Sequence, residues 1–237
     1  MRLVEVNRLR LFVAAMAVAL LGTFAAVPGF AQTSAPPGTG ETFKDTSMLK
    51  PPPGVKVAVI EFQDLMCPAC AHAFPIVHAA AAHYNIPLIE RDFPLPGHAP
   101  MGSFEAAVWA RYLQDKVSMK VADDYRGAVF AAQAGISNKD DMLNFTRRYF
   151  QTHGMQMPFV PDPTGQFAKE VNADKAIGER LAVYYTPCII VCTQKEWVHV
   201  TDVSQLYQTI DALIARAGSA APVKTAMKAP TAKTVTH

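Results

Sequence analysis

Two cysteines separated by two residues, Cys67 and Cys70, are the side chains of this sequence best suited to chemistry. Thiols at this spacing can form a disulfide and exchange it with the thiols of another molecule. If the pair opens a helix, free backbone N–H groups and the positive end of the helix dipole lower the pKa of the first thiol. The first cysteine then reacts with the substrate and the second releases the product. Pro68 suits a first helical turn because it has no N–H to lose there.

Three other interpretations of the cysteine pair remain open at this point. The pair could be a structural disulfide, two inert thiols, or half of a zinc site completed by Cys188 and Cys192. Zinc is disfavoured because those two cysteines would lie ~13 Å apart on a regular strand, which suits joint ligation poorly. They share one face of that strand, so we expect them to pack in the core, with a third redox thiol at Cys188 as the alternative.

Two positions elsewhere in the chain are candidates for assisting the cysteines. Thr186 and Pro187 precede a strand-like segment. The proline either simply starts the strand or follows a cis peptide bond, and we expect the cis form, facing the cysteines and offering backbone groups to an extended substrate. Glu61 lies near the end of an apolar strand before Cys67, where burial would raise the pKa of its carboxyl. It is a candidate for exchanging a proton with Cys70, the alternative being an exposed strand-end carboxylate.

The seven histidines show no metal-binding spacing. His72, which follows Cys70 closely, could stabilise a thiolate if protonated, but such a residue is more often an exposed helical one. His98 lies in a loop segment without a visible partner. The chain also lacks a Ser-His-Asp signature and a phosphate-binding glycine loop.

The segments that must position the cysteines alternate between strand and helix. Residues 55–62 form a β-branched run of strand length, residues 67–83 have a helical composition, and residues 86–93 are typical of a second strand. A strand, helix and strand in this order favour a right-handed parallel unit.

A block of helices interrupts the strands. Periodicity predicts about four helices within residues 99–184, one of them with Ser137 as its N-cap. Strand patterns return at 188–193 and 196–201, where the short link predicts an antiparallel hairpin, and residues 204–215 form an amphipathic helix. We therefore predict an α/β fold in the order β-α-β, helices, β-β-α.

Both ends of the chain differ in composition from this body. Residues 1–31 combine a basic start, an apolar run and small residues, which is the pattern of a secretory signal peptide, with an uncleaved anchor as the alternative. Residues 32–54 are rich in proline and glycine and predict a flexible leader. Residues 217–237 lack acidic and aromatic side chains and predict a disordered tail. The net charge of the 237-residue chain, +2, argues against a nucleic-acid partner.

The combination of motifs resembles the DsbA-type thiol-disulfide oxidoreductases of the thioredoxin-fold superfamily. The resemblance covers about residues 55–215 and depends on four motifs: Glu61-Phe62, Cys67-Pro68-x-Cys70, Arg91-Asp92-Phe93-Pro94-Leu95 and Tyr185-Thr186-Pro187. It implies a thioredoxin-fold domain (55–98 and 185–216) with an inserted helical domain (99–184). Cys188 departs from the usual pattern, because a small polar or apolar residue is commoner after the cis-proline.

The resemblance also implies roles for individual residues. Cys67 would be the exposed nucleophile, Cys70 the resolving thiol, Pro187 the cis-proline and Glu61 the buried acid. Three neighbouring residues would contact the substrate: Pro68, Ala69 and Thr186. We expect no metal and no bound cofactor, because the redox equivalents travel on the Cys67–Cys70 disulfide.

The resulting hypothesis is a periplasmic or extracellular dithiol oxidase that forms disulfides in exported proteins. Its expected partners are thiol-containing exported proteins and a membrane-bound redox protein, and it would meet the membrane itself only through an uncleaved signal segment. Two alternatives are a reductase or isomerase on the same fold, and a non-catalytic protein-binding module in which the disulfide is static. The reduction potential of the pair separates these three possibilities.

Overall fold

The computed structural model describes residues 43–219. The predicted signal peptide, residues 32–42 of the leader and residues 220–237 of the tail lie outside the described residues. Within residues 43–219, no helix combines the length and the apolar character needed to cross a membrane.

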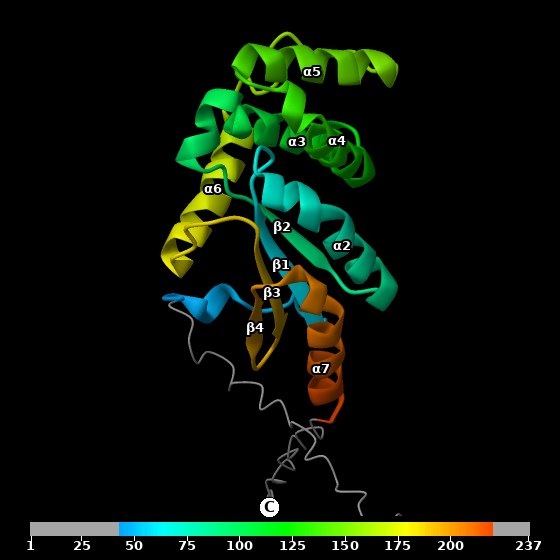
Figure 1. The fold of residues 1–237 in the computed structure, drawn as a ribbon, viewed down its shortest axis with the longest axis vertical. Helices are drawn as coiled ribbons and strands as arrows, with labels where there is room; N and C mark the ends of the chain where they lie inside the picture. Colours follow the sequence, from blue (N-terminus) through cyan, green and yellow to red (C-terminus); the bar gives the residue numbers. More distant parts are fainter. Residues whose placement is uncertain (1–42, 220–237) are drawn as a thin grey trace, which may run out of the picture. The chain divides into compact units, whose positions relative to one another are not determined.

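A four-stranded sheet forms the centre of the described structure (Figure 1). Its strands are β1 (Val57–Gln63), β2 (Leu88–Asp92), β3 (Cys188–Thr193) and β4 (Trp197–Val200). Their order across the sheet is β2-β1-β3-β4. The first two strands run parallel, while β3 runs antiparallel to both β1 and β4. The predicted order β-α-β, helices, β-β-α is confirmed, as is the hairpin between the last two strands.

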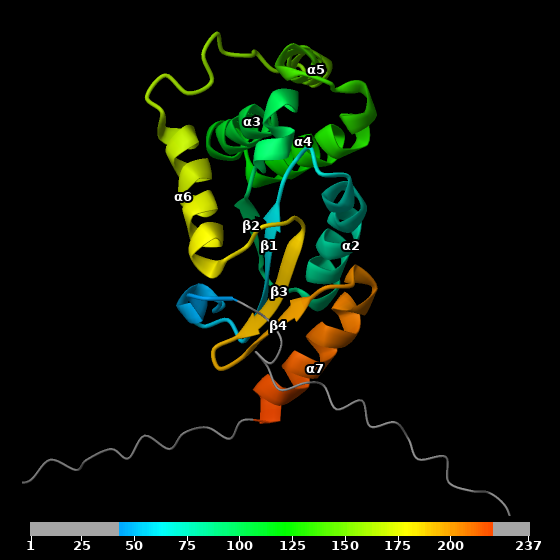
Figure 2. The same ribbon diagram turned by 60° about the vertical axis from the view of Figure 1, so that its left-hand side comes forward.

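Helices cover both faces of the sheet because its strands are apolar on both sides. On one face, Val57 and Val59 pack with residues of α2 (Pro68–Tyr84) and α7 (Leu206–Ser219). On the other face, Ala58, Ile60 and Phe62 belong to a cluster that includes the end of α6 (Gln166–Leu181). Figure 2 shows α6 on the opposite side of the strands from α2 and α7.

The close approach of α6 to the sheet requires a glycine at position 178. A Cβ atom built there would lie 2.5 Å from Cε2 of Phe93 and 3.2 Å from Cδ1 of Phe62. A Cβ atom essentially never lies within 2.5 Å of another carbon, so a side chain at position 178 would force the Phe93 ring or the helix to shift.

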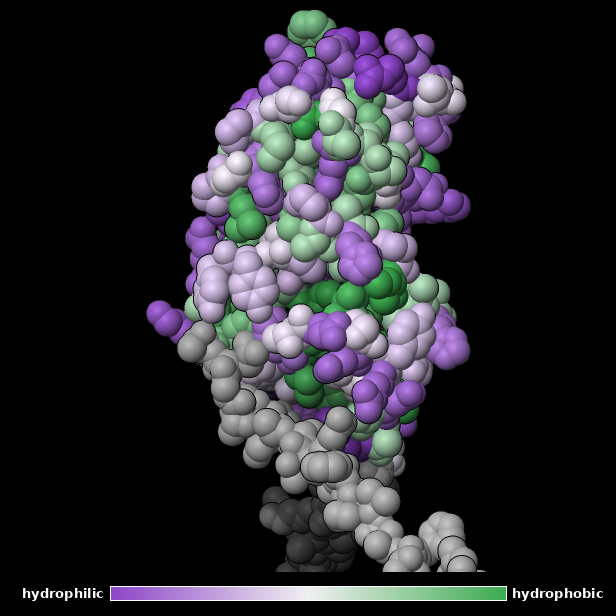
Figure 3. All heavy atoms as spheres, viewed as in Figure 1, coloured by the Kyte–Doolittle hydropathy of each residue, from purple (hydrophilic) through white to green (hydrophobic). Residues whose placement is uncertain are grey.

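Three helices stack beyond one end of the sheet (Figure 1): α3 (Ser103–Lys116), α4 (Met119–Ala132) and α5 (Lys139–Thr152). Their shared core is strongly aromatic and includes Trp109, Tyr125, Tyr149 and Phe150. Hydrophilic side chains gather along the outer edge formed by α5 (Figure 3). With α6, these helices make the inserted helical segment that the sequence predicts between the two groups of strands.

Short turns and caps link these elements. Asn138, not the predicted Ser137, caps α5, because the Asn138 side chain accepts the hydrogen bond from Asp141 N–H. The N–H of Ser137, one residue before the cap, donates to the Asp141 carboxylate. Four 3₁₀ helices also lie within residues 43–219: η1 (Thr46–Met48), η2 (Pro96–Met101), η3 (Gln133–Gly135) and η4 (Val203–Gln205).

Residues 43–54 differ from the flexible leader that the sequence predicts. Leu49 is only 2 % exposed and packs in the core cluster on the α6 face. The ring of Phe43 lies 5.3 Å from that of Trp197 on β4, and the Lys44 N–H donates to the carbonyl of Leu181. The expectation failed because it rested on the proline content of the segment, which does not exclude burial of single apolar side chains.

Candidate redox site

The two cysteines of the motif lie where β1 passes into α2. Cys67 is the N-cap residue of α2 and Pro68 occupies its first turn, as the sequence predicts. Cys67 is only 6 % exposed, which differs from the exposed thiol that the resemblance implies, and Cys70 is fully buried. Pro68 and Ala69 between them are exposed. None of the cysteines in the described structure is disulfide-bonded, so the structure shows the dithiol form.

The environment shifts the two thiol pKa values in opposite directions. A hydrogen bond from the Cys70 thiol lowers the pKa of Cys67 to about 5, assisted by the backbone N–H groups of Cys70 and Ala69 and opposed by burial. Burial, followed by the neighbouring Cys67, raises the pKa of Cys70 above its ordinary value. The pair can therefore hold one thiolate and one protonated thiol at neutral pH, which is what stepwise disulfide exchange requires.

The loop before β3 meets the first cysteine from the other side. The Thr186–Pro187 peptide bond is cis, as the sequence predicts. The Cys67 thiol donates a hydrogen bond to the Thr186 carbonyl at 3.2 Å. Thr186 is buried and Pro187 half-buried, whereas Tyr184 and Tyr185 just before them are exposed. The structure thus brings the predicted loop and the reactive thiol together.

Glu61 is fully buried within β1, which excludes the alternative of an exposed strand-end carboxylate. Within residues 43–219, neither of its carboxylate oxygens has a hydrogen-bond partner. Burial raises the pKa of Glu61 to about 8, the negative charge of Glu90 adds to the shift, and Arg126 opposes it. Because side chains alternate along a strand, Glu61 shares the sheet face of Val59, which is covered by the helix that carries Cys70.

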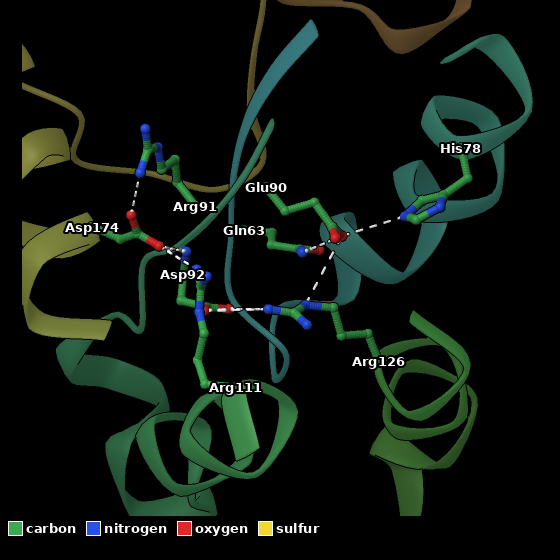
Figure 4. A network of polar contacts seen from close by, with 8 residues as sticks. All are labelled: Gln63, His78, Glu90, Arg91, Asp92, Arg111, Arg126 and Asp174. Atoms are coloured by element: carbon green, nitrogen blue, oxygen red, sulfur yellow. Dashed lines mark hydrogen bonds and ion pairs between the residues drawn. The ribbon is translucent and has the colours of Figure 1, made fainter. Parts of the chain in front are cut away.

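Glu61 pairs in register with Glu90 of β2. Glu90 belongs to a network of buried and half-buried charges that the sequence did not reveal (Figure 4). Arg126 of α4 is fully buried and donates to Asp92 of β2 at 3.0 Å. Arg111 of α3 donates to both Asp92 and Asp174, the latter on α6. The other members of the network are Gln63, His78, Glu90 and Arg91. These residues connect the β2 edge of the sheet to helices of the insertion.

Asp64, the residue that follows β1, was also missed as a functional candidate. Its carboxylate is fully buried and contacts Nδ1 of His98 at 2.8 Å and Oγ of Ser103 at 2.6 Å. The expectation that His98 has no partner is therefore wrong. The Asp64 side chain also accepts from the N–H of Met66, two residues later, which is a turn that the sequence can indicate locally. Its contacts with His98 and Ser103 depend on the tertiary fold and have no local signal.

A glutamine of the insertion contacts the same turn. The side-chain Nε2 of Gln133, at the end of α4, donates to the carbonyls of Leu65 at 2.8 Å and Cys67 at 3.1 Å. Since Cys67 is the N-cap residue of α2, Gln133 holds the backbone at the start of this helix, next to the Cys67 thiol.

The other two cysteines lie in a different part of the core. Cys188 and Cys192 are fully buried in the cluster on the α6 face, whereas Cys67 and Cys70 belong to the cluster of the helical insertion. The Cys188 sulfur lies 3.7 Å from Nε2 of His199. This placement favours the packing role over a third redox thiol.

Comparisons with known proteins agree with this geometry. A family model described as Thioredoxin matches residues 51–212. The α-DsbA2 thiol-disulfide exchange protein of Wolbachia pipientis is 20% identical with a TM-score of 0.55, and the match covers 69% of this chain and 85% of that one. A thioredoxin-like oxidoreductase of Silicibacter pomeroyi is 23% identical with a TM-score of 0.52, covering 70% and 88%.

Pseudomonas aeruginosa DsbA2 is 17% identical with a TM-score of 0.52, and the match covers 67% of this chain and 89% of that one. A comparison with curated protein sequences gives no match. The family model spans more than half of the chain, and the solved structures share its sheet with an inserted helical segment. The chain therefore belongs to the thioredoxin family and has the DsbA-like form of the thioredoxin fold, as the sequence resemblance predicts.

Proposed function

We propose that this protein is a dithiol oxidase that forms disulfides in exported proteins through Cys67 and Cys70. The observation that carries the proposal is the position of Cys67 at the start of α2, beside the Thr186 carbonyl and the Cys70 thiol. A low pKa at Cys67 stabilises its thiolate, which makes the reduced form the favoured product and the disulfide an oxidant.

The reaction proceeds by two exchanges. A substrate thiolate attacks Sγ of Cys67 in the oxidised protein, the Cys67–Cys70 bond breaks, and Cys70 leaves as a thiolate that takes up a proton. The second substrate thiolate then attacks the substrate sulfur of the mixed disulfide, and Cys67 leaves as a thiolate. The substrate dithiol loses two electrons and the cysteine pair gains them.

Glu61 is the proposed proton donor for Cys70. Its pKa of about 8 keeps the carboxyl protonated at neutral pH, and it lies on the sheet face that α2 covers. Since the leaving Cys70 thiolate is buried, a nearby neutral acid lowers the cost of its formation. On re-oxidation the carboxylate takes the proton back.

The surface around Cys67 is proposed to bind the substrate. Pro68 and Ala69 are exposed beside the thiol. The backbone of Thr186 and Pro187 lies against Cys67 and would align an extended substrate chain.

We further propose that the protein works in the periplasm or outside the cell and that residues 1–31 export it. A membrane-bound redox partner carrying a disulfide would re-oxidise it.

The direct test is oxidation of a peptide that contains two thiols by the pre-oxidised protein. We expect Cys67→Ser to abolish disulfide formation in the peptide, because the attacked sulfur is gone. Cys192→Ala, which changes a buried thiol in the other cluster, serves as the matched control and should retain the wild-type rate. An undiminished rate in the Cys67→Ser variant would refute the mechanism.

The equilibrium of the pair with glutathione separates the oxidase from the two alternatives. An oxidase should have a potential nearer the DsbA value of about −120 mV than the thioredoxin value of about −270 mV. A value near that of thioredoxin would identify a reductase, and one below about −300 mV would identify a static disulfide.

A further inference from the structure

The carboxylate of Asp64 has an unusually complete set of partners for a residue in a turn. One oxygen, Oδ1, accepts from the Met66 N–H at 2.8 Å and from the Ser103 hydroxyl at 2.6 Å. The other, Oδ2, accepts from the Leu95 N–H at 2.7 Å and contacts Nδ1 of His98 at 2.8 Å. Four contacts from three parts of the chain leave this buried side chain with a single orientation.

The backbone of the same residue contacts both cysteines. The Asp64 N–H donates to Sγ of Cys70 at 3.5 Å, and the Asp64 carbonyl accepts from the Cys67 N–H at 3.0 Å. The Asp64 side chain therefore links the turn after β1 to residues 95–103 through hydrogen bonds. The Asp64 backbone forms hydrogen bonds with Cys67 and Cys70.

We propose that Asp64 is a positioning residue, which, together with His98, aligns the Cys70 thiol for attack on a mixed disulfide at Cys67. The proposal rests on the proposed function, because it assigns a task within the same exchange reaction. It concerns the resolving step, in which Cys70 competes with external thiols for the bond at Cys67.

The step can be followed with glutathione as the probe. The Cys70 thiolate attacks Sγ of Cys67 in the Cys67–glutathione mixed disulfide, the bond to glutathione breaks, and the Cys67–Cys70 bond forms. Glutathione leaves as a thiolate and takes up the proton that Cys70 released. The better Cys70 is aligned, the higher its effective concentration and the smaller the equilibrium fraction of mixed disulfide.

Four variants of the full-length protein test the proposal. Asp64→Asn keeps one acceptor oxygen but replaces Oδ2 by an amide that accepts no hydrogen bond. His98→Leu removes one of the two partners of Oδ2 from a half-buried position, and His98→Asn restores a donor close to the place of Nδ1. Asp202→Asn is the matched control, because Asp202 accepts from the Ser204 N–H in the same kind of turn before α7.

The measurement is the mass-resolved fraction of glutathione mixed disulfide at fixed ratios of reduced to oxidised glutathione. We expect this fraction, relative to the Cys67–Cys70 disulfide, to rise about tenfold in Asp64→Asn and His98→Leu, since one charged hydrogen bond is worth about that factor. His98→Asn and Asp202→Asn should remain near the wild-type value.

A wild-type fraction in His98→Leu, or in a folded Asp64→Asn, would overturn the proposal. Because His98 is partly exposed, we expect its variants to remain folded. They therefore test the proposal even if Asp64→Asn does not fold. A failure of the proposed function gives a different result, because the wild-type protein itself would then form no Cys67–Cys70 disulfide in any glutathione mixture.

Discussion

At the scale of single residues, three buried carboxylates in this protein have three different environments. Glu61 has no hydrogen-bond partner within residues 43–219, Asp64 has four, and Asp92 is paired with two arginines. Burial favours the protonated form of an unpartnered carboxyl, whereas donors and cations favour its charged form. For Glu61, which has burial without a donor, this raises the pKa to about 8 and suits the carboxyl to hold a proton at neutral pH.

Replacing Glu61 by Gln should change how the stability of the reduced protein depends on pH. The pKa of Glu61 is about 8 in the folded state and about 4.3 in an unfolded chain, so the folded state holds a proton that the unfolded state releases between these values. This contribution to stability is fully present below about pH 4 and is lost as the pH rises through about 8.

The wild type should therefore lose free energy of unfolding relative to Glu61→Gln as the pH rises from 4 to beyond 8, in urea titrations of both proteins. Glu179→Gln, a change at an exposed carboxylate of α6, provides the comparison and should leave the wild-type pH dependence unaltered. Parallel curves for Glu61→Gln and the wild type would contradict the raised pKa.

At the scale of elements, the end of α4 controls the backbone that leads into α2. Gln133 supplies one amide group to two carbonyls of that turn, those of Leu65 and Cys67. The insertion thus reaches the reactive thiol through hydrogen bonds to its backbone as well as through the apolar cluster that both share.

Replacing Gln133 by Leu should lower the free energy of unfolding by about 1–3 kcal/mol, because the buried Leu65 carbonyl loses its side-chain donor, while the Cys67 carbonyl keeps the Ala71 N–H. It should also speed alkylation of Cys67 by iodoacetamide, since the turn is held less firmly. Gln166→Leu removes an amide that donates to Glu170 on the surface of α6, and we expect it to have little effect on either measurement. Equal effects of the two changes would argue against the role of Gln133.

The strands, the helices and the position of the cysteine motif were predictable from the sequence, because each depends on residues that are close together in the chain. The apolar run before Cys67 and the periodicity of the helices indicate strand and helix without reference to the rest of the chain. His98, Gln133 and Arg126 were not predictable as site neighbours, because each meets its partner across more than 25 residues of chain. The burial of Leu49 was not predictable either, because the core cluster to which it belongs is formed by residues of β1, β3 and α6, far along the chain.

At the scale of the whole described structure, the charge network joins the insertion to the sheet. Arg126, Arg111 and Asp174 come from three helices of the insertion and converge on Asp92 and its neighbours in β2 (Figure 4). Such a network is costly to bury but still more costly to leave half-paired.

Replacing Arg126 by Met should therefore destabilise the protein by about 3–5 kcal/mol, because Asp92 and Glu90 lose a fully buried cation. Lys120 lies on the same helix and pairs with Asp124 at the surface, so Lys120→Met should cost less than about 1 kcal/mol. Guanidinium unfolding curves of both variants measure the difference. A cost below 1 kcal/mol for Arg126→Met would show that the network does not hold the two parts together.

The charged sequence of β2 has a consequence for the protein's behaviour at high concentration. β2 is an edge strand of the sheet, and an edge strand offers unpaired backbone groups to any other extended chain. Glu90, Arg91 and Asp92 occupy most of this short strand, and their side chains are engaged by the network. A second molecule that added a strand there would have to break the ion pairs of these side chains. Intermolecular β-pairing, and the aggregation that follows from it, is therefore disfavoured at this edge of the sheet.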